Sequence, residues 1–368
     1  MQVVHQGGGS GSVTSALHLS IGLMRAGWHV RFICPPGSEV KTLAVAAGLE
    51  VIPLQLYPRA RHRNAAALAS LLHHAPVDLV NSQSARDRQA LTWLGLTRRL
   101  AVPFVATRRQ MPRSWLVENW VTSRLAARII AVSRPVAEAL VRRGTPRDKL
   151  AVVSNGLVTE RIDAVVTAAA REQWRERVGW NPSQRTIGII SRPKDQAVVL
   201  RALANVATPV RLVLAGMDPG DLDGLIRRLP TRHSVVTIPF MPDVRPLYDL
   251  LELVLLPSRM EGLSQALLEA MGLGKPVAAS AAAGNLDLVT DGANGLLVAP
   301  TDPSAWAAAI ERLLADGALR ERLGAAARRT ARETFALTHT VERTARVYQE
   351  VLRCTAAHPG ADSPAVRT

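Results

Sequence analysis

The order of short apolar runs along the chain limits what it can fold into. Runs such as Val30–Cys34 and Leu253–Pro257 have the length of buried β-strands, and turn residues and helical segments follow them. Strands that alternate with helices in this way are typical of parallel sheets covered by helices. The alternation is interrupted at Asp163–Trp180, a polar stretch rich in Ala and Arg, and a second series begins after it. The sequence therefore predicts an α/β protein with two Rossmann-like halves.

The expected strands form two sets on either side of this interruption. They are Met1–His5, Val30–Cys34, Val51–Leu54, Val77–Asn81, Val105–Thr107, Ile129–Val132 and Leu150–Val153, and then Thr186–Ser191, Arg211–Ala215, Val235–Ile238, Leu253–Pro257, Val277–Ala279 and Gly295–Val298. A chain of 368 residues is also long for a single domain. We expect an N-terminal Rossmann-like domain over residues 1–160, a linker region over 161–183 and a C-terminal Rossmann-like domain over 184–336. A helix over 337–353 is expected to pack back toward the N-terminal domain, and 354–368 to form a disordered tail.

Composition and charge narrow the class of protein. No apolar run approaches the roughly 18–20 residues of a membrane-spanning helix, and the N-terminus has neither a basic segment nor a cleavable apolar one. We therefore expect a cytoplasmic protein. Cys34 and Cys354 have no Cys or His at metal-ligand spacing, so neither a zinc site nor a disulfide framework is expected. The formal charge of +15 favours anionic partners: nucleic acid, acidic membrane or phosphorylated substrates.

The most informative segment runs from Leu255 to Pro276. Its sequence, LLPSRMEGLSQALLEAMGLGKP, contains a buried strand, a loop that presents Glu261, and a helix that Ser264 can cap. The start of a helix offers free N–H groups and the positive end of the helix dipole to a phosphate. Glu269 follows five residues past the cap, roughly 7 Å along the helix axis, where a carboxylate can accept both hydroxyls of a ribose. On spacing alone, an amphipathic helix with two surface acids is equally acceptable.

This segment resembles the E-x7-E signature of the GT-B fold retaining glycosyltransferases of family 4, the glycosyl transferases group 1. Glu261 and Glu269 have the spacing of that signature and stand in the frame PS..EG....LEA...G.PV. Further segments match family motifs, so that the resemblance covers nearly the whole chain: Ile130–Ser133, Val152–Leu157, Val213–Gly216, Ile238–Val244, Val254–Ser258 and Gly284–Val298. The resemblance implies a GT-B fold, in which two Rossmann-like parallel-sheet domains face each other across a cleft. The N-terminal domain would take the acceptor, and the C-terminal domain the nucleotide-sugar donor.

The resemblance also implies roles for individual residues of the C-terminal half. Glu269 would bind the nucleotide ribose, and Glu261 the transferred sugar. Arg192 and Lys194 would neutralise the diphosphate as the glycosidic bond breaks, although the family's Arg and Lys are normally further apart. A solvated basic turn is the alternative for this pair. The other donor-binding residues are Gly262, Leu263 and Ser264, which offer backbone N–H groups, together with Gly216 and, in the loop that holds the base, Phe240 and Met241.

The loop Gly7–Ser12 departs from the fingerprint of a dinucleotide-binding site. Counted from Gly9, the third glycine of G-x-G-x-x-G is replaced by Thr14, and the second strand ends at Cys34 without an acid. An NAD-dependent dehydrogenase is therefore disfavoured. The resemblance implies that Gly9 and Gly11 bring the backbone close to the donor phosphates and the acceptor, and a flexible turn is the alternative.

Arg109 departs from the family pattern. Near Thr107–Gln110 the family usually has a His that touches the donor sugar or helps catalysis, and Arg109 is the nearest equivalent here. An arginine stays protonated and cannot be a general base, whereas a retaining front-side reaction can use the departing phosphate oxygen as the base. We therefore keep Arg109 among the catalytic-site residues, with a changed acceptor or weak catalysis as its consequence.

The tripeptide Asp221-Leu222-Asp223 has the form that binds a divalent metal in other glycosyltransferases. It opens an expected helix, where acids interact favourably with the helix dipole. We therefore expect no metal and no cofactor. The nucleotide-sugar donor is expected as a substrate.

Arginines are concentrated in the N-terminal half, where the resemblance places the acceptor. They are Arg59, Arg61, Arg63, Arg86, Arg88, Arg98, Arg99, Arg108, Arg109 and Arg113. The segment Pro112–Ile130 adds Trp115 and Trp120 and is similar to a helix that touches a membrane interface. We expect an anionic or lipid-linked saccharide acceptor and a peripheral contact with the cytoplasmic membrane face; a solvated basic face with two buried tryptophans is the alternative. Nucleic acid is not expected as a partner, because no binding motif is recognisable and only 4% of the residues are aromatic.

Together these features predict a retaining, metal-independent glycosyltransferase of hexosyl or heptosyl type. It would move a sugar from a nucleotide-sugar to a cell-envelope acceptor: a lipopolysaccharide core, a lipid-linked saccharide or a polysaccharide. Two alternatives stay open. One is a non-catalytic GT-B homologue that binds a sugar or scaffolds a partner, which Arg109 favours and the intact Glu261 and Glu269 disfavour. The other is a GT-B nucleotide-sugar epimerase.

Overall fold

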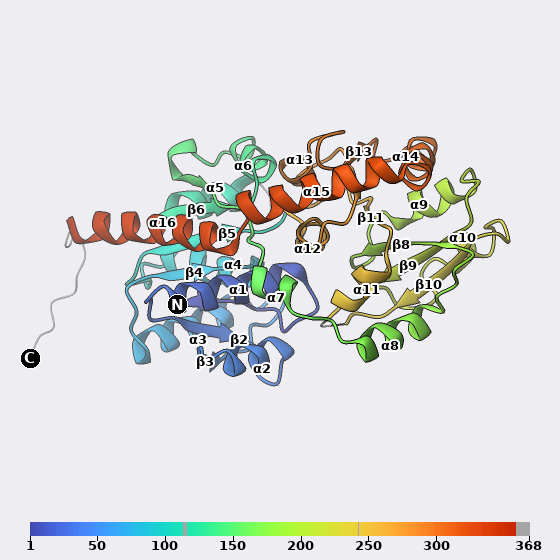
Figure 1. The fold of residues 1–368 in the computed structure, drawn as a ribbon. Helices are drawn as coiled ribbons and strands as arrows, with labels where there is room; N and C mark the ends of the chain where they lie inside the picture. The colour runs from blue at the N-terminus through green and yellow to red at the C-terminus, as the bar shows by residue number, and fades with distance from the viewer. Residues whose placement is uncertain (113–115, 242, 358–368) are drawn as a thin grey trace, which may run out of the picture. The chain divides into compact units, whose positions relative to one another are not determined.

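The computed structural model describes residues 1–112, 116–241 and 243–357. Strands and helices alternate along the chain, and their contacts divide it into two compact units (Figure 1). Unit 1 holds Met1–Gly8, Ser12–Ser154 and the described residues from Thr338 on, whereas unit 2 holds Gly9–Gly11 and Asn155–Leu337. Each unit is built on a parallel sheet of its own, which confirms the prediction of a two-domain α/β protein.

The sheet of unit 1 has seven parallel strands in the order β3-β2-β1-β4-β5-β6-β7. They are β1 (Gln2–Val3), β2 (Arg31–Cys34), β3 (Glu50–Pro53), β4 (Val80–Ser82), β5 (Phe104–Arg108), β6 (Arg128–Ala131) and β7 (Leu150–Val152). The order reverses at β1, where Gln2 pairs with Phe32 on one side and with Asn81 on the other. Sheets of this type bind ligands beyond the carboxyl ends of the strands at such a reversal.

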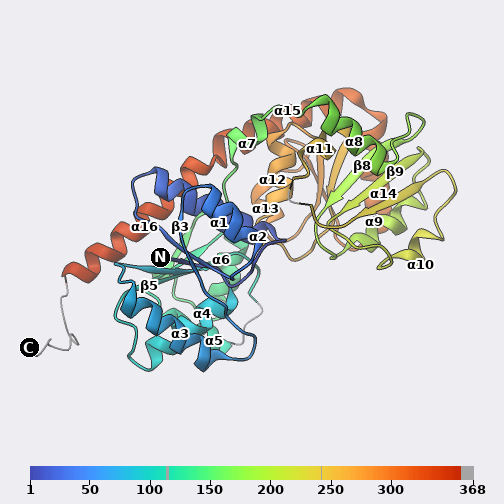
Figure 2. The same cartoon turned by 90° about the horizontal axis from the view of Figure 1, so that it is seen from below.

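Helices cover both faces of this sheet. They are α1 (Gly11–Arg25), α2 (Glu39–Ala46), α3 (Arg61–His74), α4 (Ala85–Leu96), α5 (Leu116–Leu125), α6 (Arg134–Val141) and α16 (Leu337–Ala357), with a 3-10 turn at Arg147–Lys149. α3, α4 and α5 lie together on one face, and α1 lies on the other (Figure 2). α4 packs against both α3 and α5, so these three helices form a layer of their own on the sheet.

The last helix fastens the end of the described chain to the first sheet. Tyr348 of α16 is buried, and its hydroxyl oxygen accepts hydrogen bonds from Gln2 Nε2 at 3.0 Å and from Asn81 Nδ2 at 2.5 Å. Gln2 and Asn81 belong to the paired central strands β1 and β4. α16 therefore caps the middle of the sheet of unit 1.

α16 is longer than the sequence predicts. Its helical hydrogen bonding continues past Arg353 to Ala357, and Thr355 Oγ1 donates to the carbonyl oxygen of Val351 at 2.9 Å. The prediction of disorder is therefore wrong for residues 354–357, because the last turn still follows the helix register. The rest of the expected tail, 358–368, lies outside the described residues.

The sheet of unit 2 has six parallel strands in the order β10-β9-β8-β11-β12-β13. They are β8 (Arg185–Ile190), β9 (Val210–Ala215), β10 (Ser234–Ile238), β11 (Leu253–Leu256), β12 (Val277–Ser280) and β13 (Leu296–Val298). Its order reverses between β8 and β11, where Ile187 pairs with Leu253. The carboxyl ends of β8 and β11 thus mark the expected ligand edge of this unit.

The helices of unit 2 follow its strands in turn. They are α7 (Thr159–Asp163), α8 (Ala168–Val178), α9 (Gln196–Leu203), α10 (Asp223–Ile226), α11 (Arg245–Leu250), α12 (Gln265–Gly272), α13 (Asn285–Leu288), α14 (Pro303–Ala315) and α15 (Gly317–Thr334). A core cluster fills the space between the sheet and the packed helices α9 and α14, with Trp306 fully buried. The strands read as apolar runs because helices cover both faces of a parallel sheet.

The segment that the sequence assigns to a linker, residues 161–183, carries α8. Trp174 and Val178 of this helix are buried, and α8 ends at Gly179, whose φ of 57° is the left-handed conformation that favours glycine. By its contacts this segment belongs to unit 2.

The segment Pro112–Ile130 does not form one helix. α5 ends at Leu125, and Ala127 N–H donates to the carbonyl oxygen of Phe104 at 2.9 Å as the chain enters β6. The similarity to a single helix therefore fails at the end of the segment, where Arg128–Ile130 pair with β5 and enter the strand that the sequence predicts from Ile129 on.

The surface of α5 is apolar in part. Trp120 is 50% exposed and Val117 72% exposed, and the guanidinium of Arg124 lies 5.2 Å from the Trp120 ring centroid. The alternative of two buried tryptophans is therefore wrong for Trp120, and Trp115 lies outside the described residues. Among the residues that the structure describes, the helices are too short or too polar to cross a membrane.

Candidate active site

In unit 2 the segment between β11 and α12 presents the glutamate motif. α12 begins directly after Ser264, whose Oγ accepts a hydrogen bond from the N–H of Leu267 at 3.2 Å, so the structure has the expected cap. Gly262 and Leu263 precede this cap and lie before the positive end of the helix dipole. The local sequence therefore places two backbone N–H groups and a helix start at the carboxyl end of β11.

Neighbouring segments hold this loop in place. The N–H of Gly284 donates to the carbonyl oxygen of Glu261 at 3.1 Å, and a Cβ on Gly284 would overlap the carbonyl oxygen of Gly262. From the other side, Asn155 Nδ2 donates to the carbonyl oxygen of Leu263 at 3.0 Å. Position 284 needs glycine for this close approach, and the loop backbone is fixed by it.

Glu261 is 9% exposed and forms an ion pair with Lys194. Lys194 lies in the loop after β8, and the buried Gln196 shapes that loop. Gln196 Oε1 accepts the N–H of Lys194 at 2.6 Å, and Gln196 Nε2 donates to the carbonyl oxygen of Arg192 at 2.9 Å. The structure therefore brings the predicted Lys194 to the predicted Glu261, while Arg192 is exposed and has no ion pair with any described residue.

Glu269 lies on the buried side of α12 and is 7% exposed. Its Oε1 lies 3.5 Å from Nη1 of Arg161. Burial raises the pKa of the Glu269 carboxyl above its ordinary 4.5, and the positive charge of Arg161 opposes this rise. Arg161 is positioned by Arg245, whose Nη1 donates to the Arg161 carbonyl at 2.9 Å and which pairs with Asp243 at 2.8 Å. A carboxylate with two oxygens keeps capacity to accept further hydrogen bonds beside such a cation.

Gly216, Phe240 and Met241 lie after the adjacent strands β9 and β10. Gly216 has a φ of 94°, and its N–H donates to the carbonyl oxygen of Ile238 at 2.8 Å. Phe240 is exposed, and Met241 Sδ accepts a hydrogen bond from Arg177 Nη1 at 3.5 Å. These residues stand at the same edge of the sheet as the loop of Lys194, because parallel strands end on one side.

Two glycines of the N-terminal loop group with unit 2. Gly9 has a φ of 67° with open space around the position of a Cβ, whereas a Cβ on Gly11 would lie 3.2 Å from the Cβ of Gln265. Glycine is thus required at position 9 for its backbone conformation, and at position 11 a side chain would crowd the first residue of α12.

In unit 1 a cavity of about 380 Å³ opens at the carboxyl ends of β1, β4 and β5. Arg109 lines this first cavity, and its Nε donates to Gln83 Oε1 at 2.9 Å. Gln83 Nε2 in turn donates to Gln2 Oε1 at 2.6 Å, and Gln2 reaches Tyr348 of α16. Burial lowers the pKa of Arg109 to about 10, so it carries a positive charge at neutral pH.

The first cavity also contains a histidine that the sequence analysis missed. His5 Nδ1 lies 2.6 Å from Ser84 Oγ and 3.2 Å from Oδ1 of Asp87, which is fully buried. A carboxylate beside Nδ1 favours the tautomer that carries its proton there, which leaves Nε2 as a hydrogen-bond acceptor. The signal for this group is the Ser84-x-x-Asp87 capping box at the start of α4, but only the paired strands bring it to His5.

Two family models match the chain one after the other. The model described as Glycosyltransferase Family 4 matches residues 9–161, and the model described as Glycosyl transferases group 1 matches residues 170–330. The chain belongs to the group 1 glycosyltransferases.

Solved structures agree with the GT-B fold of this group. Anabaena HepE in complex with UDP-glucose superposes with a TM-score of 0.82 at 20% identity, covering 95% of this chain and 98% of that one. The lipopolysaccharide outer core galactosyltransferase WaaB superposes with a TM-score of 0.70 at 15% identity, covering 95% and 100%. The predicted GT-B fold, with two Rossmann-like parallel-sheet domains, is therefore confirmed.

Curated relatives of this chain are named for different activities. The D-inositol 3-phosphate glycosyltransferase of Xylanimonas cellulosilytica is 34% identical over 218 residues, which cover 55% of this chain and 52% of that protein. The alpha-D-kanosaminyltransferase of Streptomyces kanamyceticus is 32% identical over 204 residues, which cover 53% of each. An uncharacterised glycosyltransferase of Methanocaldococcus jannaschii is 27% identical over 234 residues, covering 61% of this chain and 60% of that protein. The matches thus span between 52% and 60% of the lengths of these relatives.

The N-terminal arginines of this chain fall into separate groups. Arg88, Arg108 and Arg109 are buried and line the first cavity. Burial lowers the pKa of Arg108 to about 9, with the charge of Arg88 adding to the effect. The interpretation as one solvated basic face is therefore wrong for these three. Arg59, Arg61 and Arg86 line a second cavity, Arg63 lies over the Tyr57 ring, Arg98 and Arg99 are exposed, and Arg113 lies outside the described residues.

The tripeptide 221–223 lies on the surface of unit 2. Asp221 and Asp223 are both exposed, and Asp223 is the first residue of α10. Its carboxylate lies 3.9 Å from Nη1 of Arg227, one helical turn later. This is the usual pairing of an acid at a helix start with a basic residue four positions further on.

Proposed function

We propose that this group 1 glycosyltransferase moves a hexosyl or heptosyl group from a nucleotide-sugar to a hydroxyl of an anionic cell-envelope acceptor, with retention and without a metal or cofactor. The observation that carries the proposal is the pair of buried glutamates around one helix start, each beside a different cation. Glu261 pairs with Lys194, and Glu269 pairs with Arg161. HepE, a structural neighbour, was solved with UDP-glucose.

On the donor side, the Glu269 carboxylate accepts hydrogen bonds from the two ribose hydroxyls. Glu261 and the N–H groups of Gly262, Leu263 and Ser264 bind the transferred sugar and the phosphate next to it, with Phe240 and Met241 beside the base. The fixed position of this loop supports the assignment, because donors that are already oriented lose little energy to reorganisation.

Lys194 and Arg192 would neutralise the diphosphate. Lys194 already forms an ion pair with Glu261, which holds its ammonium group in position. A bound diphosphate would be a second anion beside this ammonium group. Arg192 is exposed and has no ion pair among the described residues, so its guanidinium is available to a phosphate. These two charges stabilise the leaving group, the role that a divalent metal has in other glycosyltransferases.

The transfer itself is a substitution at the anomeric carbon. The bond from this carbon to the diphosphate oxygen breaks, and a bond to the acceptor oxygen forms on the same face of the sugar. The proton of the acceptor hydroxyl passes to the departing phosphate oxygen, so the products are a glycoside and a nucleoside diphosphate. Arg109 stays protonated at neutral pH, so it orients anionic groups and takes no proton.

The first cavity of unit 1 is the proposed acceptor site. Arg88, Arg108 and Arg109 give it a positive character, which favours an anionic acceptor. The exposed Val117 and Trp120 of α5 support a peripheral contact with the cytoplasmic membrane face, where a lipid-linked or lipopolysaccharide-core saccharide is found. One relative is named a D-inositol 3-phosphate glycosyltransferase, and D-inositol 3-phosphate is likewise anionic.

Calorimetric binding of UDP-, GDP- and ADP-sugars tests the donor assignment. We expect one class of nucleotide-sugar to bind, and Glu269→Ala to abolish binding because it removes the proposed ribose acceptor. Glu321→Ala is the matched control, since Glu321 is an exposed acid on α15 of the same unit. If no nucleotide-sugar binds the wild-type protein, the proposed function is wrong.

A non-catalytic sugar-binding or scaffold role is the second candidate, favoured by Arg109 in place of the family His. Donor hydrolysis separates the two. A transferase releases free nucleoside diphosphate slowly in the absence of acceptor, whereas a scaffold that binds the same donor releases none.

A further inference from the structure

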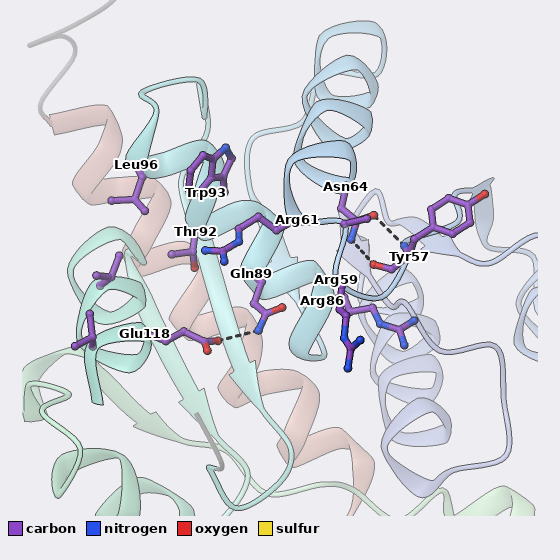
Figure 3. A pocket seen from close by; sticks show the side chains of 13 residues that line it. Tyr57, Arg59, Arg61, Asn64, Arg86, Gln89, Thr92, Trp93, Leu96 and Glu118 are labelled. Atoms are coloured by element: carbon purple, nitrogen blue, oxygen red, sulfur yellow. Dashed lines mark hydrogen bonds between the residues drawn. The ribbon is translucent and has the colours of Figure 1, made fainter. Parts of the chain in front are cut away.

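Unit 1 contains a second cavity that the proposed transfer does not use. It has a volume of about 480 Å³ and lies among α3, α4, α5 and the loop before α3 (Figure 3). This volume is within the range of roughly 300–1,000 Å³ that is usual for small-molecule sites. Its lining includes three arginines, several other polar side chains and a group of apolar ones.

Three arginines form the cationic part. Arg59, Arg61 and Arg86 line the cavity, and none has a carboxylate partner among the described residues. The guanidinium of Arg61 lies 5.6 Å from the Trp93 ring centroid, and Arg86 Nη1 donates to the carbonyl oxygen of Leu56 at 3.3 Å. In Figure 3 the side chain of Arg61 extends toward Thr92, away from the side chains of Arg59 and Arg86. Like charges that line one cavity repel each other, and an anion bound in the cavity relieves the repulsion.

Glu118 is the acid that lines this cavity, and it is already engaged. Its Oε1 lies 3.7 Å from Arg88 Nη2 and accepts a hydrogen bond from Gln89 Nε2 at 3.2 Å. It therefore does not neutralise Arg59, Arg61 or Arg86.

The cationic wall is ordered by the surrounding structure. The buried Asn64 accepts the N–H of Tyr57 at 2.9 Å and donates to the Tyr57 carbonyl at 2.8 Å, which pins the loop to α3. Arg59 has a φ of 56°, a conformation that few residues with a side chain adopt and that is concentrated at functional sites. α3 begins after Ala60, which provides no side-chain cap, so its first N–H groups add to the positive character of this wall.

Another part of the cavity lining is apolar. Trp93, Leu96, Val117 and Val121 line it, and Leu96 and Val117 are exposed, with 52% and 72% of their surface accessible. Exposed apolar side chains beside a polar wall are a feature of sites that bind amphiphilic ligands.

The second cavity adjoins the first. Gln89 and Glu118 line both, and their side chains are joined by the hydrogen bond at 3.2 Å. A ligand in the second cavity therefore lies one side-chain layer away from the proposed acceptor site.

We propose that the second cavity binds a phosphate ester of the acceptor, with the phosphate on Arg59, Arg61 and Arg86 and an apolar group on Trp93, Leu96 and Val117. Arginine suits this role because its planar guanidinium binds phosphate through two parallel hydrogen bonds. The proposal rests on the proposed function in that it names the chemical class of the acceptor, but the binding itself requires no donor.

Calorimetry without nucleotide tests the proposal with three probes: geranyl monophosphate, inorganic phosphate and geraniol. We expect geranyl monophosphate to bind more tightly than either of the others, because only it reaches both walls. The triple variant Arg59→Gln, Arg61→Gln, Arg86→Gln should weaken its binding at least tenfold. Arg99→Gln, an exposed arginine in the same unit that does not line the cavity, is the matched control and should bind as the wild type does.

A second variant separates the two walls. Val117→Gln should weaken geranyl monophosphate binding and leave inorganic phosphate binding unchanged, and the exposure of Val117 makes misfolding of this variant unexpected. Equal binding of geraniol and geranyl monophosphate overturns the proposal, as does a triple variant that binds as tightly as the wild type.

Vesicles identify the source of the phosphate. Binding to vesicles of phosphatidic acid and phosphatidylcholine, but not phosphatidylcholine alone, with loss in the triple variant, assigns the site to a membrane lipid. Binding of geranyl monophosphate without any vesicle binding assigns it to a soluble phosphate ester. A protein that binds geranyl monophosphate but no nucleotide-sugar refutes the proposed function alone, so the two failures are distinguishable.

Discussion

Glu269 shows how a single buried residue can make ligand binding depend on pH. Burial raises the pKa of its carboxyl, and Arg161 lowers it again. In the proposed role the carboxylate accepts two hydroxyl protons, so only the ionised form binds the ribose fully. Donor binding is therefore expected to be complete above the pKa of Glu269 and to be lost as the pH falls through it.

Replacing Arg161 tests this dependence. Arg161→Gln removes the charge that favours ionised Glu269, so the pKa of Glu269 should rise further and the loss of donor binding should begin at a higher pH. We expect the Kd of the variant to exceed that of the wild type several-fold at the acid end of a calorimetric series and to approach it at the alkaline end. Arg171→Gln, which removes an exposed ion pair with Asp249 in the same unit, should leave the pH dependence unchanged. A constant ratio of the two Kd values at every pH would contradict the explanation.

At the scale of single elements, a glycine outside the motif decides where the motif loop lies. Gly284 stands just before α13 and faces the carbonyl oxygen of Gly262, while its own N–H holds Glu261. The loop and the segment before α13 are therefore in backbone contact at the point where the donor would bind.

Gly284→Ala should displace this loop. The added Cβ overlaps a backbone oxygen, which no side-chain rotation can relieve, so residues 261–263 must shift. We expect donor affinity to fall about tenfold or more, equivalent to about 1.4 kcal/mol, with a smaller effect on the melting temperature. Gly317→Ala is the matched control, because a Cβ there meets only the flexible end of Arg320 at 3.6 Å. Wild-type donor affinity in Gly284→Ala would show that the loop does not need this contact.

The strands were predictable from the sequence because buried strands are continuous apolar runs, which local residues determine. β8 begins at Arg185 and ends at Ile190, one residue from the expected limits at each end. The end of α16 was predicted wrongly. Its helical hydrogen bonding continues to Ala357 although residues 354–357 are exposed, so no buried apolar residue in the sequence marks this last turn.

The candidate site was predictable only where its residues are close in sequence. Glu261, Ser264 and Glu269 share one loop and helix, so their spacing alone brings them together. The ion pair of Glu269 with Arg161 joins a residue of the expected linker to α12, and His5 meets Asp87 only through the pairing of β1 with β4. Such contacts depend on strand order, which no local pattern of residues determines.

At the scale of the whole molecule, hydrogen bonds between residues far apart in the sequence connect the proposed acceptor site to the last described helix, α16. Arg109 in the first cavity is held by Gln83, Gln83 by Gln2, and Gln2 by Tyr348 of α16. Burial raises the pKa of Tyr348 to about 12, so its hydroxyl stays neutral at physiological pH. The last described helix is therefore part of the polar network beneath the proposed acceptor site.

Tyr348→Phe should weaken unit 1 and loosen Arg109 together. The substitution leaves the amide donors of Gln2 and Asn81 buried without their acceptor, and each unsatisfied buried group costs about 1–3 kcal/mol. We expect the midpoint of thermal unfolding to fall and hydrogen exchange to quicken in β1 and β4, while donor binding by unit 2 is unchanged, because both hydrogen-bond partners of the Tyr348 hydroxyl, Gln2 and Asn81, belong to unit 1. Tyr57→Phe is the control, since the Tyr57 side chain is exposed and only its backbone is hydrogen-bonded to Asn64. Equal melting temperatures for the two variants would mean that the hydroxyl of Tyr348 adds nothing to stability, and that α16 is held by its apolar face alone.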